Sequence, residues 1–308
     1  MGRATSTTKI SKRARLARRS LGQFVEDPDV PIEKRRELME RIDKAPRPRK
    51  VDYVDTTVGG VPSIVATPTG VPVEREVMYI HGGGYVVGSP KSHIAMCARL
   101  ARLARARTTV IDYRLAPEHP YPAAIDDCLS AYRSIIADTD PSLVTIAGDS
   151  AGGGATLATL CALRDADVPL PGAGYVISPW TDLTASGETV QTRAASDPLI
   201  DAGWLSDIAT QYAVDVPLDH PAVSPLFADL SGLPPLLVQT ASEEVLLSDS
   251  TRLVERARDA GVSVDFDVRD GMWHVYQIFA GMVPEADDAL IEAAAFIRAK
   301  TPVPVSTG

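Results

Sequence analysis

The segment Gly148-Asp149-Ser150-Ala151-Gly152 contains the serine with the clearest sign of chemistry. It directly follows an apolar run, residues 143–147, and precedes a run of small residues that predicts a helix. A serine on such a sharp strand-to-helix turn has a strained backbone, and its hydroxyl stands at a helix N-terminus, where developing negative charge is favoured. The bare pattern also fits a plain turn, but the strand before it and the helix after it favour Ser150 as a nucleophile.

Three consecutive glycines, in His81-Gly82-Gly83-Gly84, follow another short apolar run. Glycine runs cost conformational entropy, so this one indicates that the backbone must approach another group closely. Acyl transfer passes through a tetrahedral intermediate whose oxyanion needs N–H donors. We expect Gly82, Gly83 and Ala151 to supply them, and His81 to hold the loop by hydrogen bonds. The alternatives are a flexible loop or a phosphate cradle, but no Lys-Ser/Thr pair follows and the dinucleotide-binding spacing is absent.

A serine hydroxyl needs a base to remove its proton, and the chain has five histidines. His81 is assigned to the glycine loop, His93 opens a predicted helix, and His119 and His220 each precede a proline. His274 remains, in a loop between the last predicted strand and the last predicted helix. A single histidine in a loop is more often solvated, but elimination makes His274 the candidate base.

The base in turn needs a carboxylate that fixes its tautomer and stabilises the imidazolium. Three carboxylates follow the predicted strand 235–240, namely Glu243, Glu244 and Asp249. We favour Glu244, because it lies in the loop that leaves the strand end. Glu243 is expected to face solvent or cap the next helix, and Asp249 to lie within that helix. Spacing alone leaves this choice open.

The candidate residues lie within alternating β-rich and helical runs that begin at residue 51, a pattern typical of a mostly parallel sheet covered by helices. The predicted strands are 51–58, 62–67, 75–80, 108–113, 142–147, 172–178, 235–240 and 263–268. The predicted helices are 91–106, 122–137, 151–166, 245–260 and 285–299, with another near 202–213. Residues 1–50 and 182–217 break the alternation. We therefore predict a catalytic domain, 51–308, with an N-terminal cap segment, 1–50, and a cap insertion at about 182–217.

The composition excludes several classes of protein. Of 308 residues, 45% are hydrophobic and 23% charged, as in ordinary globular chains. The net charge is -9, and residues 1–20 contribute +7, so the remainder carries -16. This acidic body argues against nucleic acid as a partner, and the basic segment is expected to be solvated, although it could touch an anionic surface.

The sequence also predicts the cellular compartment of the protein. No run of about 18 apolar residues occurs, so we expect no integral membrane association. The absence of a recognisable secretory signal predicts a cytoplasmic location. Cys97, Cys128 and Cys161 lack any paired spacing, and we interpret them as core residues in a reducing compartment.

The ordered motifs resemble the bacterial hormone-sensitive-lipase-type (family IV) esterases of the α/β-hydrolase fold. Besides the serine turn and the glycine loop, the matching segments are Asp112-Tyr113-Arg114-Leu115-Ala116-Pro117-Glu118, Ser178-Pro179-Trp180 and Gly271-Met272-Trp273-His274. The resemblance implies a mostly parallel eight-stranded sheet flanked by helices, with a helical cap. It also implies the chain order serine, acid, histidine, and its acid segment aligns with residues 240–246, which places Glu244 where most members have aspartate.

The resemblance implies a carboxylesterase that hydrolyses short-chain acyl esters through Ser150, Glu244 and His274 and an acyl-enzyme intermediate. No cofactor is implied, and the sequence has no His-Glu-x-x-His motif or cysteine pair that would bind a metal. The expected partner is a small-molecule ester, and a homodimer through the last sheet edge is possible for this family. Lactone hydrolysis or deacetylation on the same triad stays open. A non-catalytic small-molecule receptor is disfavoured by the complete triad.

The substrate pocket is less constrained by sequence. We expect it to be lined by apolar and aromatic residues near the three motifs, and each could equally be a packing residue. These candidates are Tyr85, Val87, Trp180, Trp204 and Trp273.

Overall fold

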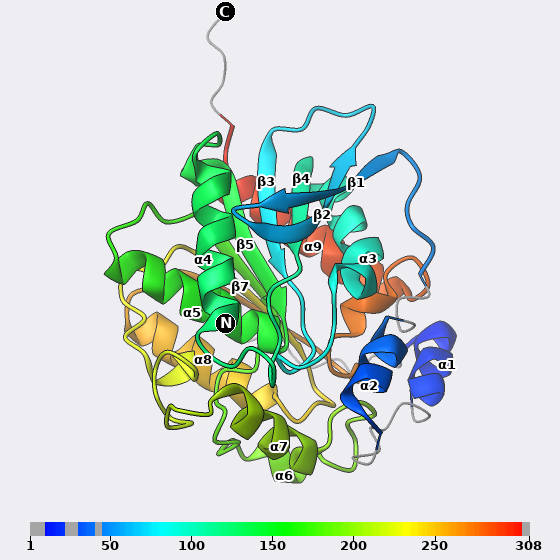
Figure 1. The fold of residues 1–308 in the computed structure, drawn as a ribbon. Helices are drawn as coiled ribbons and strands as arrows, with labels where there is room; N and C mark the ends of the chain where they lie inside the picture. Colours follow the sequence, from blue (N-terminus) through cyan, green and yellow to red (C-terminus); the bar gives the residue numbers. More distant parts are fainter. Residues whose placement is uncertain (1–9, 22–29, 41–44, 304–308) are drawn as a thin grey trace, which may run out of the picture.

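The protein is described here from a computed structural model that covers residues 10–21, 30–40 and 45–303. These residues form one eight-stranded sheet in the order β1-β2-β4-β3-β5-β6-β7-β8 (Figure 1). The first two strands, β1 (Val51–Val58) and β2 (Val61–Pro68), form a hairpin, and β2 pairs antiparallel with β4. All other neighbours are parallel, which confirms the predicted α/β-hydrolase sheet.

The other strands begin and end within two residues of the predicted bounds. They are β3 (Arg75–Ile80), β4 (Ala106–Ile111), β5 (Val144–Asp149), β6 (Ala173–Ile177), β7 (Leu236–Ala241) and β8 (Val264–Arg269). The largest shifts are in β4 and β5. Strand β5 begins late because Asp140 accepts a 2.9 Å hydrogen bond from the Ser142 N–H and caps a 3-10 turn there. Strand β4 begins early because Arg107 pairs across the sheet with Glu76 of β3.

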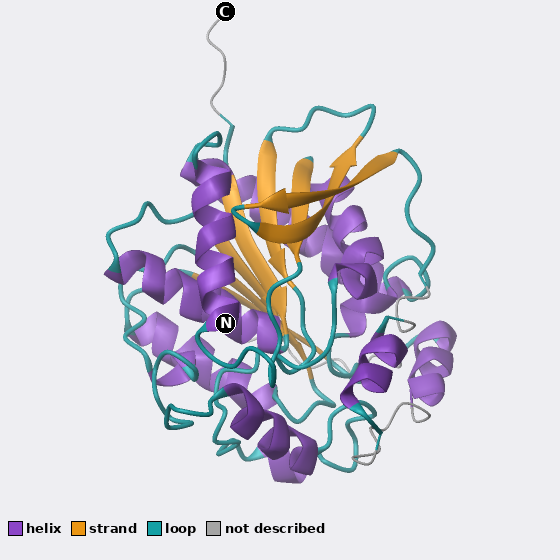
Figure 2. Cartoon of the chain, in the orientation of Figure 1, coloured by secondary structure: helices purple, strands orange, loops and turns teal. Residues whose placement is uncertain are grey.

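Helices cover both faces of the sheet (Figure 2). Helices α4 (Ala123–Ile136), α5 (Ala151–Asp165) and α8 (Leu247–Asp259) pack into one apolar layer, and α3 (Pro90–Ala104) and α9 (Pro284–Lys300) into the other. Short 3-10 turns lie at Pro141–Leu143, Pro225–Phe227 and Tyr276–Phe279. All three cysteines are buried, as predicted.

The two stretches predicted as a cap contain four further helices: α1 (Lys12–Leu21), α2 (Ile32–Met39), α6 (Thr189–Thr192) and α7 (Ala202–Tyr212). All four lie at the end of the molecule where the parallel strands finish (Figure 1). Arg3 and Lys9 of the basic segment lie outside the described residues. Within the described ranges, no helix is long and apolar enough to span a bilayer.

Candidate active site

Ser150 occupies the sharp turn between β5 and α5 that the sequence predicts. Its backbone has φ +52° and ψ -122°, a conformation that is strained for a residue with a side chain. Gly152 is required next to it, because a Cβ at that position would lie 2.1 Å from the Ile80 carbonyl oxygen of β3. The close approach of the helix to β3 therefore fixes the direction in which the serine leaves the sheet.

The glycine loop after β3 lies against this turn. The Gly82 N–H donates a 3.1 Å hydrogen bond to Oδ1 of Asp149, the residue before the serine. This carboxylate occupies the donor, so our expectation that Gly82 faces an oxyanion is corrected. The N–H groups of Gly83, Gly84 and Ala151 have no acceptor within the part of the chain that the structure describes. They are the donors left available beside Ser150.

His81 holds the glycine loop, as the sequence predicts. Its Nδ1 lies 2.8 Å from the Gly82 carbonyl oxygen, and its ring stacks on Tyr113 with centroids 4.3 Å apart. Burial lowers the pKa of His81 to about 3, so the ring is neutral and Nδ1 can donate to that carbonyl. His81 is therefore a structural residue of the loop.

His274 and Glu244 come together from separate segments. Nδ1 of His274 lies 3.3 Å from Oε2 of Glu244, an ion-pair distance at which the N–H is not well aligned with the carboxylate. Burial alone would lower the pKa of His274, but the neighbouring carboxylate outweighs it and raises that pKa above its ordinary value. The imidazolium of His274 is thus stabilised, as a general base requires.

The other two carboxylates considered from the sequence lie elsewhere. Glu243 pairs with Arg193 at 3.6 Å, and Asp249 lies in α8, as predicted. Glu244 is buried and accepts hydrogen bonds from the hydroxyls of Thr240 and of Ser178, the latter at 2.7 Å. The sequence did not identify these two hydroxyls, although each belongs to a motif noted there.

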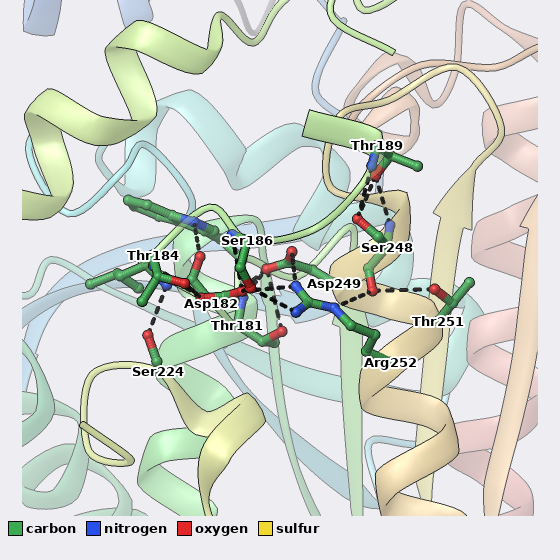
Figure 3. Close-up of polar contacts among 12 residues, drawn as sticks. Thr181, Asp182, Thr184, Ser186, Thr189, Ser224, Ser248, Asp249, Thr251 and Arg252 are labelled. Carbon is green, nitrogen blue, oxygen red and sulfur yellow. Dashed lines mark hydrogen bonds and ion pairs between the residues drawn. The ribbon is translucent and has the colours of Figure 1, made fainter. Parts of the chain in front are cut away.

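A buried polar cluster supports the loop that carries Glu244 (Figure 3). Oδ2 of Asp249 accepts hydrogen bonds from the N–H groups of Thr181 and Asp182, at 2.8 and 3.0 Å. Arg252 lies 2.8 Å from Asp182 and 3.2 Å from Asp249, and burial raises the pKa of Asp249 to about 7. The cluster joins the segment after β6 to α8, which directly follows the Glu244 loop in the chain.

The predicted cap insertion is bonded to the same loop. The Thr189 hydroxyl donates to the Val245 carbonyl oxygen at 2.7 Å, and the Val245 N–H donates to Oδ2 of Asp197 at 2.9 Å. Oδ1 of Asp197 also accepts from the N–H groups of Leu199 and Ile200, at 2.9 and 3.1 Å. Asp197 therefore closes a turn and also holds the residue next to Glu244.

A second buried histidine–carboxylate pair lies behind the serine. Nε2 of His93 is 3.3 Å from Oδ2 of Asp149, and the Tyr79 hydroxyl donates to Oδ1 at 2.8 Å. Burial alone would raise the pKa of Asp149, but His93 and Tyr79 hold it below its ordinary value. This carboxylate therefore stays charged and links the serine turn to Gly82. Sequence alternation gave no sign of the link.

Four of the five candidate pocket residues belong to one apolar layer. Tyr85, Val87 and Trp180 are buried there, and Trp204 packs against them. Trp273 lies in the opposite layer, where its ring meets Phe279 edge-on with centroids 5.7 Å apart. We therefore correct the expectation for Trp273, whose side chain packs in the core.

Helix α7 closely approaches the glycine loop. Tyr212 stacks on Tyr85 with ring centroids 3.7 Å apart, and a Cβ at Gly84 would lie 2.3 Å from Cδ1 of Ile208. Trp204, on the same helix, lines a cavity of about 130 Å³ together with Ala194 and residues 197–201. Space beside the glycine loop is thus bounded by α7.

Comparison with known proteins agrees with this fold and geometry. A family model described as the alpha/beta hydrolase fold matches residues 77–278. An acetyl-hydrolase of Streptomyces hygroscopicus is 43% identical over 228 residues, which are 74% of this chain and 76% of that protein. An esterase of Acinetobacter venetianus is 38% identical over 222 residues, 71% of this chain and 73% of that protein.

Solved structures give the same result. The crystal structure of an esterase from the bacterial hormone-sensitive lipase family superposes with a TM-score of 0.92 and 38% identity, and covers 96% of this chain and all of the other. EstE5, in a crystal soaked with p-nitrophenyl butyrate, superposes with a TM-score of 0.90 and 35% identity over 94% of this chain and 99% of its own. The chain therefore belongs to the α/β-hydrolase family. Within it, the chain is one of the bacterial hormone-sensitive-lipase-type esterases, which are carboxylic-ester hydrolases.

Proposed function

We propose that this enzyme hydrolyses short-chain acyl esters through an acyl-enzyme on Ser150. The observation that carries the proposal is the buried Glu244 carboxylate 3.3 Å from Nδ1 of His274. A carboxylate on that nitrogen leaves Nε2 to accept the serine proton. Nε2 has no hydrogen bond to any residue that the structure describes, which supports this role.

In the first half-reaction Ser150 Oγ attacks the acyl carbon while its proton passes to Nε2 of His274. The N–H groups of Gly83, Gly84 and Ala151 stabilise the oxyanion, and we propose Gly84 in place of Gly82 because Gly82 donates to Asp149. The C–O bond to the alcohol then breaks, and the alcohol leaves with the proton from His274. In the second half a water molecule attacks the acyl carbon and its proton goes to His274. The bond between the acyl carbon and Ser150 Oγ then breaks, Oγ takes the proton back from His274, and the carboxylic acid is released.

The acyl side of the pocket is proposed to be short. Ile208 and Trp204 of α7 stand over Gly84, and Tyr85 beside it is held by the stacked Tyr212. These contacts restrict space next to the proposed oxyanion site. A relative named acetyl-hydrolase and a related crystal soaked with a butyrate ester are consistent with acyl groups of this size.

We also propose that α1, α2, α6 and α7 form a cap over the site. Arg36 of α2 supports this role, since its guanidinium donates to the carbonyl oxygens of Val86 and Ala116 at 2.9 and 3.0 Å and pairs with Glu118 at 2.7 Å. From the other side, the Tyr121 N–H donates to the Tyr212 carbonyl oxygen at 2.8 Å. A cytoplasmic location and a homodimer stay predictions.

The test is a series of p-nitrophenyl esters from acetate to palmitate, with kcat/KM measured for the wild type and for Ser150→Ala. Turnover should be highest for the short acyl chains and absent in Ser150→Ala. Retained turnover in Ser150→Ala would remove the nucleophile assignment, and a rate that rises toward palmitate would remove the short-chain proposal.

Deacetylation of an acetylated alcohol is a second candidate on the same residues, favoured by the name of the 43% identical relative. It uses the same steps with acetate as the acid product. Activity on acetyl esters of bulky alcohols that exceeds activity on p-nitrophenyl butyrate would favour it, whereas loss of activity as the alcohol grows would exclude it.

A further inference from the structure

Helix α1 has one exposed face made of cations around a single leucine. Lys12, Arg13, Arg15, Leu16 and Arg19 are exposed, and we call these five residues the α1 face. Lys12, Arg13 and Arg19 lie three or four positions from Leu16, and Arg15 lies three positions from Lys12 and four from Arg19, so these side chains are neighbours on the helix surface. The Leu16 side chain is 70% exposed.

The opposite side of α1 fixes its orientation on the body. Ala14 and Leu21 are buried there. The Ser11 N–H and hydroxyl both donate to the Glu285 carboxylate, at 2.5 and 3.0 Å. The α1 face therefore points outward, at the edge of the molecule (Figure 1).

The charge of the α1 face is not balanced locally. Residues 1–25 contain no aspartate or glutamate, while the rest of the chain is strongly acidic. Within the described ranges, Lys12, Arg13 and Arg19 have no carboxylate within ion-pair distance, and Arg15 donates to the Ile10 carbonyl oxygen. The α1 face is thus a positive patch on a negative protein.

We propose that the α1 face docks the enzyme on an anionic lipid bilayer. A leucine surrounded by lysines and arginines suits the boundary between head groups and acyl chains, because the leucine can enter the acyl region while the cations stay with the phosphates. A nucleic acid would use the cations and leave Leu16 exposed, and its extended charge would be repelled by the acidic body. The lone apolar side chain therefore favours lipid.

The docked helix is joined to the segment that forms the cavity near α7. The Arg18 guanidinium donates to the carbonyl oxygen of Ser196, which directly precedes Asp197 in the lining of this cavity, at 2.6 Å. Docking through α1 would bring the cavity close to the bilayer surface. If the proposed ester hydrolysis holds, esters dissolved in the membrane become the natural substrate class. The docking itself does not depend on that activity.

Cosedimentation of the full-length Ser150→Ala protein with vesicles tests the docking without lipid hydrolysis. We expect the protein to pellet with vesicles of equal parts phosphatidylcholine and phosphatidylglycerol, and not with phosphatidylcholine alone. The triple variant Lys12→Gln, Arg13→Gln, Arg19→Gln should bind about 100-fold more weakly, since each cation near an anionic surface contributes about 1 kcal/mol. Failure of the Ser150→Ala protein with an unchanged α1 face to pellet with anionic vesicles would overturn the proposal.

A matched variant removes one lysine and two arginines elsewhere on the surface: Lys91→Gln, Arg105→Gln, Arg133→Gln. It should bind anionic vesicles as tightly as the parent, and an equal loss would mean that only total charge matters, against the proposal. Leu16→Ser should weaken vesicle binding several-fold and leave binding to duplex DNA unchanged. If Leu16→Ser has no effect on vesicles, or if DNA binds as tightly as they do, the α1 face is a general polyanion site and the lipid assignment fails. A thermal melt of each α1 variant, compared with that of the parent protein, reports that the variant is folded.

Discussion

Two buried histidines in this enzyme each lie 3.3 Å from a carboxylate, but their surroundings differ. Nδ1 of His93 lies 2.9 Å from the Ser92 hydroxyl, and its Nε2 is against Asp149. His274 has Glu244 beside Nδ1, and its Nε2 has no hydrogen bond to a described residue.

The difference separates a structural pair from one suited to proton transfer. A histidine with both nitrogens occupied can hold its neighbours, but it cannot accept a proton from a third group without losing a partner. Asp149 is likewise occupied, by Tyr79, Gly82 and His93. The number of open positions, more than burial or distance, is what distinguishes His274.

The largest expected effect comes from changing the His274–Glu244 pair. His274→Ala should lower kcat by about 10⁶, as losing the base does in comparable triads. Its melting temperature should fall by less than that of Asp149→Asn, because Nε2 holds no neighbour in place and Glu244 keeps its hydrogen bonds from Ser178 and Thr240. Stopped assays with p-nitrophenyl acetate and a thermal melt measure both quantities. A His274→Ala enzyme with more than one-hundredth of wild-type kcat would show that His274 is not the general base.

Glu244→Gln should follow with a loss of about 10⁴ in kcat, since the amide cannot stabilise the imidazolium. Glu243→Gln is the matched control, because Glu243 precedes Glu244 in the chain and contacts Arg193 at 3.6 Å. It should stay within about twofold of the wild type, since a partly exposed ion pair contributes little. Steady-state kinetics that ranked the two in the opposite order would move the acid to Glu243.

Asp149→Asn tests the His93–Asp149 pair, in which both ring nitrogens of His93 have partners. We expect kcat to fall about 100-fold with little change in KM, because the neutral amide is a weaker acceptor for Gly82 and no longer pairs with His93 as a charge. The N–H groups of the glycine loop then shift away from the oxyanion position. The melting temperature should also fall, and by more than in His274→Ala. Asp140→Asn, at the other end of β5, is the control and should leave kcat unchanged. An Asp149→Asn enzyme with normal kcat would show that the pair does not position the loop.

The smallest expected effect is a shift in pH dependence. His274 must be neutral to act as a base, so kcat/KM falls as the pH drops through its pKa. That pKa is raised by Glu244, which places the acid limb above about 6.5, the ordinary value for histidine. Glu244→Gln should move the residual acid limb to lower pH, since the carboxylate that contributes most to raising the pKa of His274 is then gone. Asp149→Asn should move this limb by less, because the Asp149 carboxylate contributes less than Glu244 to raising that pKa. A limb that moved further in Asp149→Asn than in Glu244→Gln would reassign the titrating group.

Features that depend on local sequence pattern, such as the serine turn and the strands of the sheet, could be predicted from the sequence. The strand before Ser150 and the glycines around it specify the turn, and the alternation of strands and helices specifies the sheet. Elimination together with the family order specified His274 and Glu244, which the structure brings to 3.3 Å.

Other features required side-chain directions that no pattern records. Gly82 and Gly83 are equivalent in sequence, and only the position of the Asp149 carboxylate shows which N–H is occupied. Trp273 is next to His274 in the chain, but its ring packs in the apolar layer that contains α3 and α9. The bond from Val245 to Asp197 joins residues 48 positions apart, and no spacing rule predicts it.

The three buried cysteines described above have a practical use. Burial raises the pKa of Cys128 to about 12 and that of Cys161 to about 11, so these thiols are seldom ionised at neutral pH, and thiol reagents react with the thiolate. Cys97 is inaccessible at 0% exposure. A single cysteine introduced at Leu16 could therefore be labelled with a fluorophore without first removing the native ones. The same molecule would then report by its emission whether α1 meets lipid.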